Sequence, residues 1–486
     1  MPSKVRRRRS LEDGDPFALI LAPPEGETPE QRDVRLLLEK EAKQISDAID
    51  EQLSRERQQD KKGTKPVKVL LLGQSESGKS TTLKNFQLMY DPKAFHAERA
   101  SWRTVIELNV VRSIHVILEV ITRAERLTQD DSSDPLVDQE LLALKRRLSP
   151  LIHVEEVLMQ RLMPSGSDQS DAARLAQIAQ IPYTHKPGGV KGEVTINSTT
   201  QWKDLFSRDK YNEESAERDA TGVLLHTHAN DLKTLWGSSK VQSLLIQQNI
   251  RLQEAAGFFL DCLDEVTSLD YIPSDDHILR ARLKTLGVSE HRIKMTSGGM
   301  TGSISRDWRI YDVGGHRSLV MAYPDRIQGD IGRSTAAWAP YFDDMHSIIF
   351  LCPISAFDQV LAEEPRVNRL ADSVNLWTTI VSNKLLAKTN IILFLNKTDI
   401  MKSKLESGIR FVDYVNSYGK RPNDFESASS YLRKKFGGLF KEKSPSPRVF
   451  YCHLTTVTDR KSTQLILANI KDQLMQRYLE DASLLA

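Results

Sequence analysis

The segment from Gly73 to Thr81 has the residue types and the spacing that bind phosphate. It reads GQSESGKST, which fits the pattern G-x-x-x-x-G-K-[ST], and it lies between an apolar run and a helical pattern. Glycines in such a loop let backbone N–H groups turn inward around phosphate oxygens, and the next helix adds a favourable dipole. We expect Lys79 to bring its charge to the outer phosphates and the Ser80 hydroxyl to ligate Mg²⁺. The sequence therefore predicts a nucleotide-phosphate site.

A second motif indicates which base is bound. The tetrapeptide Asn396-Lys397-Thr398-Asp399 has the form N-K-x-D and directly follows an apolar run at 391–395. It is therefore expected at the carboxyl end of a strand, where open α/β sheets bind their ligands. A carboxylate at Asp399 can accept hydrogen bonds from both N1–H and N2–H₂ of guanine, whereas adenine offers no matching pair of donors. The motif favours a guanine nucleotide.

A third motif, DVGG, ends another predicted strand. Its Asp312 can hold Mg²⁺ through a water molecule. Its Gly315 lets a backbone N–H reach the γ-phosphate, because glycine has no side chain in the way. Its position between the other two motifs supports a triphosphate bound with Mg²⁺.

Apolar runs and helical spacing predict the elements that position these motifs. The predicted strands are 67–72, 291–295, 308–313, 347–351, 390–395 and 448–451. The predicted helices near them are 81–89, 367–386, 409–418, 427–436 and 463–479. Strands that alternate with helices indicate an α/β domain with a mainly parallel sheet covered on both faces.

A helical block interrupts this α/β pattern. Helical spacing recurs at 102–127, 136–163 and 223–269, and the polar stretch 164–221 is expected to be mostly a mobile loop. The expected division is a disordered basic and proline-rich tail at 1–31, an N-terminal helix at 32–62, an α/β domain made of 63–91 and 273–486, and an all-helical domain at 92–272.

The composition argues against several other classes of protein. The chain has 486 residues, of which 67 are basic and 65 acidic, so a formal net charge of +2 argues against nucleic acid as a partner. Three widely spaced cysteines cannot form a disulfide framework, which fits a cytoplasmic protein. No apolar run is long enough to span a bilayer. The arginines from Arg6 to Arg9 could contact anionic lipid or direct nuclear import.

With these motifs in this order, the sequence resembles the α subunits of heterotrimeric G proteins from about residue 30 to 480. Further likeness lies in DHILRARLKT at 276–285, FDQVLAE at 357–363 and TTVT at 455–458. The resemblance implies a Ras-like P-loop GTPase domain interrupted by an inserted all-helical domain, with the nucleotide between them. It also implies Mg²⁺-dependent binding of GTP and its hydrolysis to GDP. The chain would then be a signalling switch that couples a membrane receptor to an effector, with a βγ dimer as a further partner.

The resemblance also implies roles for individual residues. Arg282 would be the catalytic arginine that the chain itself supplies, as is general in Gα proteins, and Thr285 would be a second hydroxyl on Mg²⁺ beside Ser80. The backbone N–H of Val457 would meet the guanine oxygen. The implied GTP-binding residues are Glu76, Ser77, Gly78, Lys79, Ser80, Thr81, Glu254, Ala255, Leu279, Arg280, Arg282, Thr285, Asp312, Gly315, Asn396, Lys397, Asp399 and Val457.

The chain departs from the family pattern at three places. His316 follows DVGG where the family has a glutamine that orients the attacking water, so we expect His316 in the catalytic position and slowed hydrolysis. The stretch 319–337 lengthens the family's switch II, which puts the usual βγ and effector contacts in doubt. Position two is Pro2 and the first cysteine is Cys262, so we expect no lipidation site and at most a peripheral contact with the inner face of the plasma membrane.

Two alternatives remain open at this point. Because His316 replaces the glutamine, the chain could bind GTP with little or no hydrolysis. A P-loop ATPase or a nucleotide kinase would share the phosphate-binding loop, although the N-K-x-D motif argues against both.

Overall fold

The structure is a computed structural model of the chain. It describes residues 29–62, 66–128, 137–162, 195–197, 221–248, 250–252, 257–286, 288–299, 302–314, 345–361 and 364–481. The chain divides into two units, Met1–Lys65 and Pro66–Ala486. The first unit contains helix α2 (Pro29–Lys62), which begins slightly before the predicted start at residue 32, because proline is favoured in the first turn of a helix.

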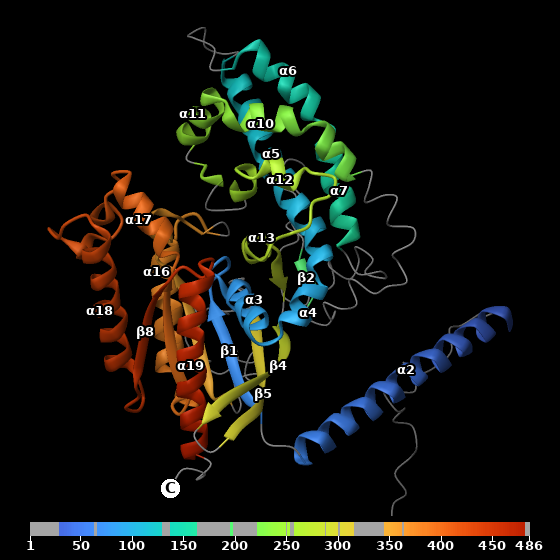
Figure 1. Ribbon diagram of the computed structural model, residues 1–486, viewed down its shortest axis with the longest axis vertical. Coiled ribbons are helices and arrows are strands. Elements are labelled where there is room, and N and C mark those ends of the chain that lie inside the picture. The colour runs from blue at the N-terminus through green and yellow to red at the C-terminus, as the bar shows by residue number, and fades with distance from the viewer. Residues whose placement is uncertain are drawn as a thin grey trace, which may run out of the picture. The chain divides into compact units, whose positions relative to one another are not determined.

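The second unit contains a six-stranded sheet with the order β4-β5-β1-β6-β7-β8 (Figure 1). Its strands are β1 (Val67–Gly73), β4 (Val288–Gly299), β5 (Gly302–Val313), β6 (Ser347–Pro353), β7 (Asn390–Asn396) and β8 (Phe450–Thr455). β4 is antiparallel to β5, and the other neighbouring pairs are parallel. The mainly parallel sheet and its six predicted strands are confirmed.

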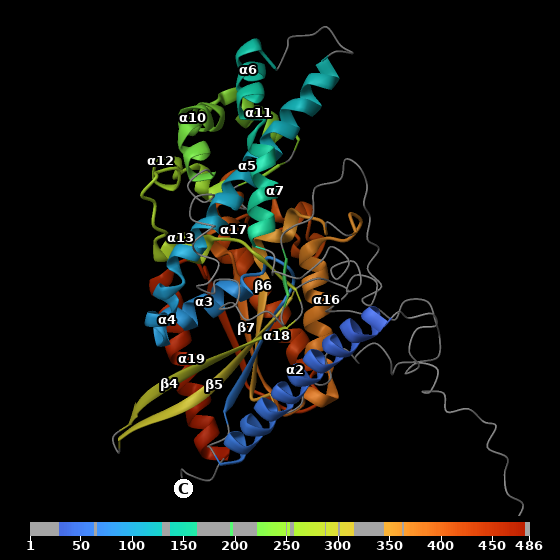
Figure 2. The same ribbon diagram turned by 90° about the vertical axis from the view of Figure 1, so that its right-hand side faces the viewer.

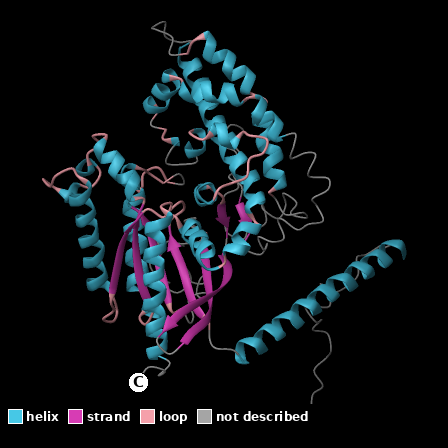
Figure 3. Cartoon of the chain, in the orientation of Figure 1, coloured by secondary structure: helices cyan, strands magenta, loops and turns pink. Residues whose placement is uncertain are grey.

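Helices cover both faces of this sheet, because the central strands are apolar on both sides (Figure 3). Leu70 and Phe350 lie in an apolar core with side chains of α16 and α18. Leu71 and Ile349, one residue away, lie in a second core with α3 and α19 on the opposite face. The covering helices are α3 (Lys79–Tyr90), α16 (Arg369–Ser382), α18 (Phe425–Lys443) and α19 (Arg460–Asp481).

The helices that follow α3 in the sequence share a separate apolar core. They are α4 (Pro92–Ala97), α5 (Arg99–Thr128), α6 (Gln139–Leu148), α7 (Leu151–Arg161), α10 (Ala229–Gly237), α11 (Ser239–Gln247), the 3₁₀ turn η4 (Gly257–Leu260), α12 (Leu263–Val266) and α13 (Asp275–Arg280). The long helix α5 packs against α7 and α11 (Figure 2). The pattern predicted at 136–163 forms two helices, since Pro150 lies at their junction.

One predicted helix is wrong. The stretch 409–418 forms two 3₁₀ turns, η7 (Phe411–Asp413) and η8 (Asn416–Tyr418), because the Asn423 side chain accepts the N–H of Phe411 at 2.8 Å and replaces a helical partner. The helix lies earlier, at α17 (Thr398–Glu406), and it ends before Gly408, whose φ of +91° favours glycine.

The insertion predicted at 164–221 lies almost entirely outside the described residues. Within it the structure describes β2 (Thr195–Asn197), a strand that the sequence did not predict. β2 pairs in parallel with β3 (Lys284–Leu286), so that Ile196 lies opposite Thr285. Among the helices that the structure describes, none has both the length and the apolar composition needed to cross a bilayer.

Candidate functional site

Two glycines set the course of the phosphate-binding loop between β1 and α3. Gly73 has φ +145° and Gly78 has φ +104°, which are conformations that other residues rarely adopt. A Cβ on Gly73 would also overlap the carbonyl oxygen of Leu351 in β6, and one on Gly78 would overlap the side chain of Asn396, the last residue of β7. The loop therefore lies directly against the carboxyl ends of the two strands that follow β1 in the sheet.

Lys79 is the buried cation of this loop. Its ammonium donates to the carbonyl oxygens of Gly73 at 2.9 Å and Gln74 at 2.7 Å, so the side chain folds back over the loop. Burial lowers the pKa of Lys79 to about 8, although the Asp312 carboxylate opposes this shift. A cation that is so poorly solvated is stabilised by an anion, which fits a phosphate ligand.

Two oxygen groups that Mg²⁺ prefers lie together beside the loop. The Ser80 hydroxyl donates to Oδ2 of Asp312 at 2.7 Å, which brings the first and third motifs into contact. Hydroxyl and carboxylate oxygens suit this hard cation, so the residues present fit Mg²⁺. The third predicted contributor, Thr285, belongs to β3, but its side chain lies outside the description.

Asn396 joins the base-reading motif to the phosphate-binding loop. Its Nδ2 donates to the carbonyl of Ser77 at 2.7 Å. Its Oδ1 accepts the Thr455 hydroxyl at 3.1 Å and the Val457 N–H at 3.2 Å. The Val457 N–H, which we expected to meet guanine, thus has a protein partner that guanine would replace or share.

Asp399 and Lys397 complete this corner of the site. The Thr456 hydroxyl donates to Asp399 at 3.3 Å, so the N-K-x-D motif and the 455–458 loop touch a second time. Lys397 has φ +63°, and Glu76 in the phosphate-binding loop has φ +59°; among the described residues these are the two non-glycine residues with positive φ. Backbone strain of this kind gathers at functional sites.

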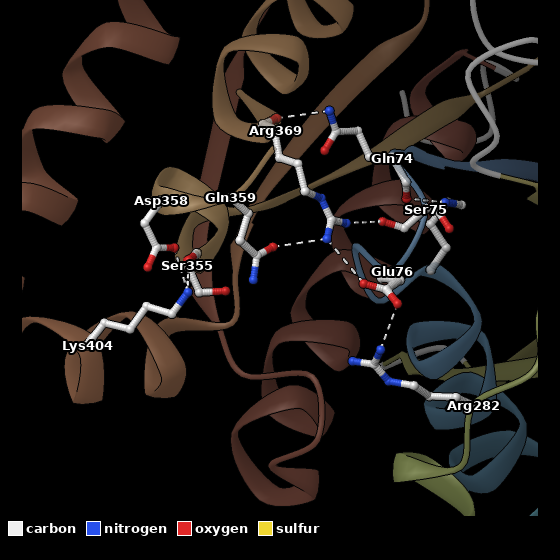
Figure 4. Close-up of polar contacts among 10 residues, drawn as sticks. Gln74, Ser75, Glu76, Arg282, Ser355, Asp358, Gln359, Arg369 and Lys404 are labelled. Atoms are coloured by element: carbon white, nitrogen blue, oxygen red, sulfur yellow. Dashed lines mark hydrogen bonds and ion pairs between the residues drawn. The ribbon is translucent and has the colours of Figure 1, made fainter. Parts of the chain in front are cut away.

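Two arginines converge on Glu76, as Figure 4 shows. Arg282 donates to one carboxylate oxygen at 2.8 Å, and Arg369 reaches the other at 3.2 Å. Arg369 also donates to the carbonyl of Ser75 at 2.8 Å and to the Gln359 side chain at 3.0 Å. Burial raises the pKa of Glu76, but the charges of Arg282, Lys397 and Arg369 outweigh it and hold the pKa at about 2. Arg369 was not singled out from the sequence, because it belongs to none of the three motifs.

Two buried side chains that the sequence analysis missed hold the segment before Arg282. The Lys84 ammonium donates to the carbonyls of Ile278 at 2.8 Å and Ala281 at 2.9 Å. Asn109 of α5 accepts the Arg282 N–H at 2.7 Å and donates to the Arg282 carbonyl at 2.9 Å. A polar residue inside the apolar pattern of α5 was the available signal for Asn109.

The remaining predicted site residues differ in how the structure places them. The Thr81 hydroxyl donates to the carbonyl of Leu279 at 3.3 Å. The Arg280 side chain instead pairs with Asp276 at 2.9 Å and lies over the Phe258 ring, 4.2 Å from its centroid. Four predicted site residues lie outside the described residues, namely Glu254, Ala255, Gly315 and His316.

A buried carboxylate links three segments near this site. Asp358 follows β6, and one of its oxygens accepts from Lys404 of α17 at 2.7 Å (Figure 4). Its other oxygen accepts from Arg251 at 2.6 Å. Lys404 also donates to the carbonyl of Ser355 at 2.8 Å. The side chains of Asp358 and Lys404 are 3 % and 5 % exposed, so this pair is shielded from water, whereas Arg251 is 37 % exposed.

Comparisons with known proteins identify the family of the chain. The family model described as G-protein alpha subunit matches residues 43–474. The guanine nucleotide-binding protein alpha-4 subunit of Mycosarcoma maydis is 30 % identical over 96 % of this chain and 95 % of its own. The alpha-1 subunit of the same organism is 27 % identical over 92 % and 98 %. The G(o) subunit alpha of Geodia cydonium is 26 % identical over 92 % and 97 %.

The Asp358–Lys404 pair gives a stability prediction. Asp358→Asn leaves the Lys404 ammonium buried without its counter-charge, and we expect the free energy of unfolding to fall by about 3–5 kcal/mol. Arg251→Gln removes only a partly exposed partner and is expected to cost less than about 1 kcal/mol. Urea unfolding followed by circular dichroism measures both. Equal losses in the two variants would show that the buried pair is not the stronger link.

Proposed function

The chain belongs to the G-protein alpha subunit family, and from this premise we propose that it is a signalling switch that binds GTP with Mg²⁺ and hydrolyses it to GDP. Members of this family bind guanine nucleotides and act as GTPases. The observation that carries the proposal is the position of Asn396, which bonds to the carbonyl of Ser77 and the N–H of Val457. One side chain thereby connects the phosphate-binding loop to both base-reading segments, which favours a guanine nucleotide over ATP.

We assign the phosphates to the loop from Glu76 to Thr81. Its backbone N–H groups at the start of α3 would face the ligand, and Lys79 would supply the cation. The lowered pKa of Lys79 supports this role, because an ammonium short of solvation gains from a neighbouring anion. The Leu279 carbonyl and the Arg280 backbone would border the same ligand, since Thr81 already contacts Leu279.

We assign Mg²⁺ to Ser80 and Thr285, with Asp312 acting through water. The 2.7 Å contact between Ser80 and Asp312 supports the grouping of two of these residues. When bound, Mg²⁺ neutralises charge on the phosphates. Gly315 follows Asp312 closely in the sequence, and its N–H is proposed to meet the outer phosphate.

We assign the guanine base to the N-K-x-D motif and the loop at 455–458. The Asp399 carboxylate is proposed to accept the two guanine donors, with Asn396, Lys397 and Val457 around the ring. Glu254 and Ala255, which come shortly after Arg251, would border the nucleotide from the helical side. The ion pair between Arg251 and Asp358 supports this side of the assignment, because it ties the chain just before Glu254 to the segment that follows β6.

Hydrolysis is assigned to Arg282 and His316. The Arg282 guanidinium would stabilise charge that develops on the transferred phosphate, and its backbone is already held by Asn109. His316 stands where the family has glutamine, so its imidazole would position the attacking water less well. This single substitution also favours the second candidate, a GTP-binding protein with little or no hydrolysis.

Partners and location follow from the family. We propose that the chain works with a receptor, an effector and a βγ dimer, in the cytoplasm and at the inner face of the plasma membrane. The length of the stretch 319–337 is the feature that would alter the choice among such partners.

Base recognition tests the proposal directly. Asp399→Asn replaces the acceptor of two guanine donors with an amide, so we expect affinity for GTP to fall and affinity for XTP to rise, with a change in preference of at least about tenfold. Competition of the two nucleotides for a fluorescent GTP analogue measures this preference. Thr398→Ser serves as the neighbouring control. A variant that keeps its full preference for GTP would remove Asp399 from the base site.

The pKa of Lys79 predicts a pH dependence of nucleotide binding. Phosphates stabilise the ammonium and so raise its pKa above the value of about 8 in the free protein. Binding therefore takes up a proton above that pH, and affinity for GDP should fall roughly tenfold between about pH 7.5 and about pH 9. The side chain of Lys79→Arg stays charged over this pH range. The affinity of this variant for GDP should therefore change only through titration of the nucleotide itself. Identical pH profiles for the two proteins would contradict this role.

The substitution at His316 predicts the hydrolysis rate. Loss of one contact to the transition state typically lowers a rate by roughly 10²–10³-fold, so we expect slow single-turnover hydrolysis that His316→Gln accelerates. Arg282→Ala should slow hydrolysis further. The charge that Arg282 would stabilise on the transferred phosphate develops with either histidine or glutamine at position 316. Release of phosphate from preloaded GTP measures all three proteins. Faster hydrolysis by the wild type than by His316→Gln would mean that imidazole positions the water adequately.

A further inference from the structure

The connection between α18 and β8 contains two serines that are each followed by a proline (Figure 1). They are Ser444, before Pro445, and Ser446, before Pro447; both serines are partly buried and both prolines are exposed. Ser444 has φ −66° and ψ 128°, the extended conformation that a following proline favours. Protein kinases bind their substrates as extended segments, and proline-directed kinases require a proline directly after the modified residue. The backbone at Ser444 therefore already has the form that such a kinase binds.

Arg448 of the same connection lies against one of the two hydroxyls. Its Nε donates to Oγ of Ser444 at 2.8 Å, and its two terminal nitrogens donate to the carbonyls of Leu386 and Val381, each at 2.7 Å. Among the described residues this guanidinium forms no ion pair with a carboxylate. Burial lowers the pKa of Arg448, because its charge is poorly solvated. The charge of Arg448 thus lies next to Ser444 without an anion from the described part of the chain to balance it.

An anion attached to Ser444 would complete this arrangement. A phosphorylated serine carries about −1.5 to −2 charge at pH 7 and three acceptor oxygens. A guanidinium binds such a group through two parallel N–H donors. Because Nε of Arg448 already points at Oγ of Ser444, the phosphate would be attached at the atom that this donor faces. Ser444 also ends α18, where the helix dipole disfavours negative charge, so the phosphate would depend on Arg448 for its stabilisation.

The other residues that a proline-directed kinase could modify have less suitable surroundings. The Ser446 hydroxyl donates to the carbonyl of Ala387 at 2.8 Å, and a phosphate there would replace this donor with negative charge that faces a carbonyl oxygen. Ser149 precedes the proline at the junction of α6 and α7, and its φ of −57° and ψ of −31° are helical rather than extended. Thr28 also precedes a proline and lies outside the described residues. The described surroundings therefore favour Ser444.

We propose that Ser444 is a phosphorylation site for a proline-directed protein kinase and that Arg448 binds the phosphate once it is attached. The Ser444 hydroxyl donates to the carbonyl of Ser446 at 3.0 Å, a contact within the connection itself, so local opening of the connection would present it to a kinase. In the transfer, Oγ of Ser444 attacks the γ-phosphorus of ATP, the bond from this phosphorus to the bridging oxygen of the β-phosphate breaks, and ADP leaves. The hydroxyl proton passes to a base of the kinase.

The phosphate would strengthen the contact between the ends of two helices. Arg448 already bonds to the carbonyl of Val381 in α16 and to the hydroxyl of Ser444 at the end of α18. Hydrogen bonds between an arginine and a phosphate are charge-assisted and stronger than the bond to a neutral hydroxyl. Phosphorylation would therefore hold the end of α18 more firmly to Arg448 and, through it, to α16.

Kinase treatment of the full chain tests the site. The chain, loaded with GDP, is incubated with a purified mitogen-activated protein kinase and ATP, and mass spectrometry of its peptides locates the phosphate. We expect phosphate on Ser444, which Ser444→Ala removes, whereas the matched control Ser149→Ala should be modified as the wild type is. Unchanged GDP affinity shows that both variants fold. The inference is overturned if Ser444 takes up no phosphate, or less than Ser446 or Ser149.

Titration of the attached phosphate tests the role of Arg448. The second pKa of a phosphoserine is about 6, and a bound guanidinium should lower this pKa to about 5 in the folded chain. ³¹P NMR measures the pKa, with a phosphorylated peptide of residues 441–449 as the reference. Arg448→Gln should return the pKa most of the way to the peptide value, whereas Lys441→Gln, which removes an exposed lysine of α18, should have little effect.

Two results of the titration would overturn the inference. One is an equal phosphate pKa in the folded chain and in the peptide, which decides the matter even if Arg448→Gln fails to fold. The other is a larger effect of Lys441→Gln than of Arg448→Gln. Neither result depends on hydrolysis of GTP, so the proposed function is tested separately.

Discussion

The site depends on how closely the phosphate-binding loop approaches the carboxyl ends of β6 and β7. Neither Gly73 nor Gly78 has room for a Cβ, because the Leu351 carbonyl and the Asn396 side chain occupy that space. This closeness lets Asn396 donate to Ser77 while it accepts from Val457. The phosphate-binding loop and the segments proposed to read the base are therefore held by one set of contacts, and a side chain added at either glycine would disturb both.

Charge is balanced across this packed loop. The buried ammonium of Lys79 is satisfied by two backbone carbonyls, and the Glu76 carboxylate by Arg282 and Arg369. Glu76 adopts a left-handed conformation that costs energy, and the two ion pairs offset that cost by fixing its side chain. Both groups are thus held in place by protein partners. A negatively charged ligand would compete with the carbonyls for Lys79 and with the Glu76 carboxylate for the arginines.

The sequence predicted those features of the fold and the site that depend on residues close together in the chain. Six strands followed from short apolar runs, and the three motifs followed from glycines and polar residues at fixed offsets. The contacts of Asn109 with Arg282, of Arg369 with Glu76 and of Asp358 with Arg251 could not be predicted. Each joins segments that are 100 to 300 residues apart, and no local pattern specifies the partner. The helix predicted at 409–418 failed for a related reason, since Asn423 takes an amide that a helix would have used.

Arg282 is held in two independent ways, and the difference matters for catalysis. Asn109 fixes its backbone through both the N–H and the carbonyl, whereas Glu76 fixes only the tip of its side chain. If Arg282 acts on the transferred phosphate as proposed, the guanidinium can leave Glu76 by rotation of the side chain while the backbone stays where α5 holds it. The arginine would then be positioned before the reaction and redirected during it, which is the form of preorganisation that costs least.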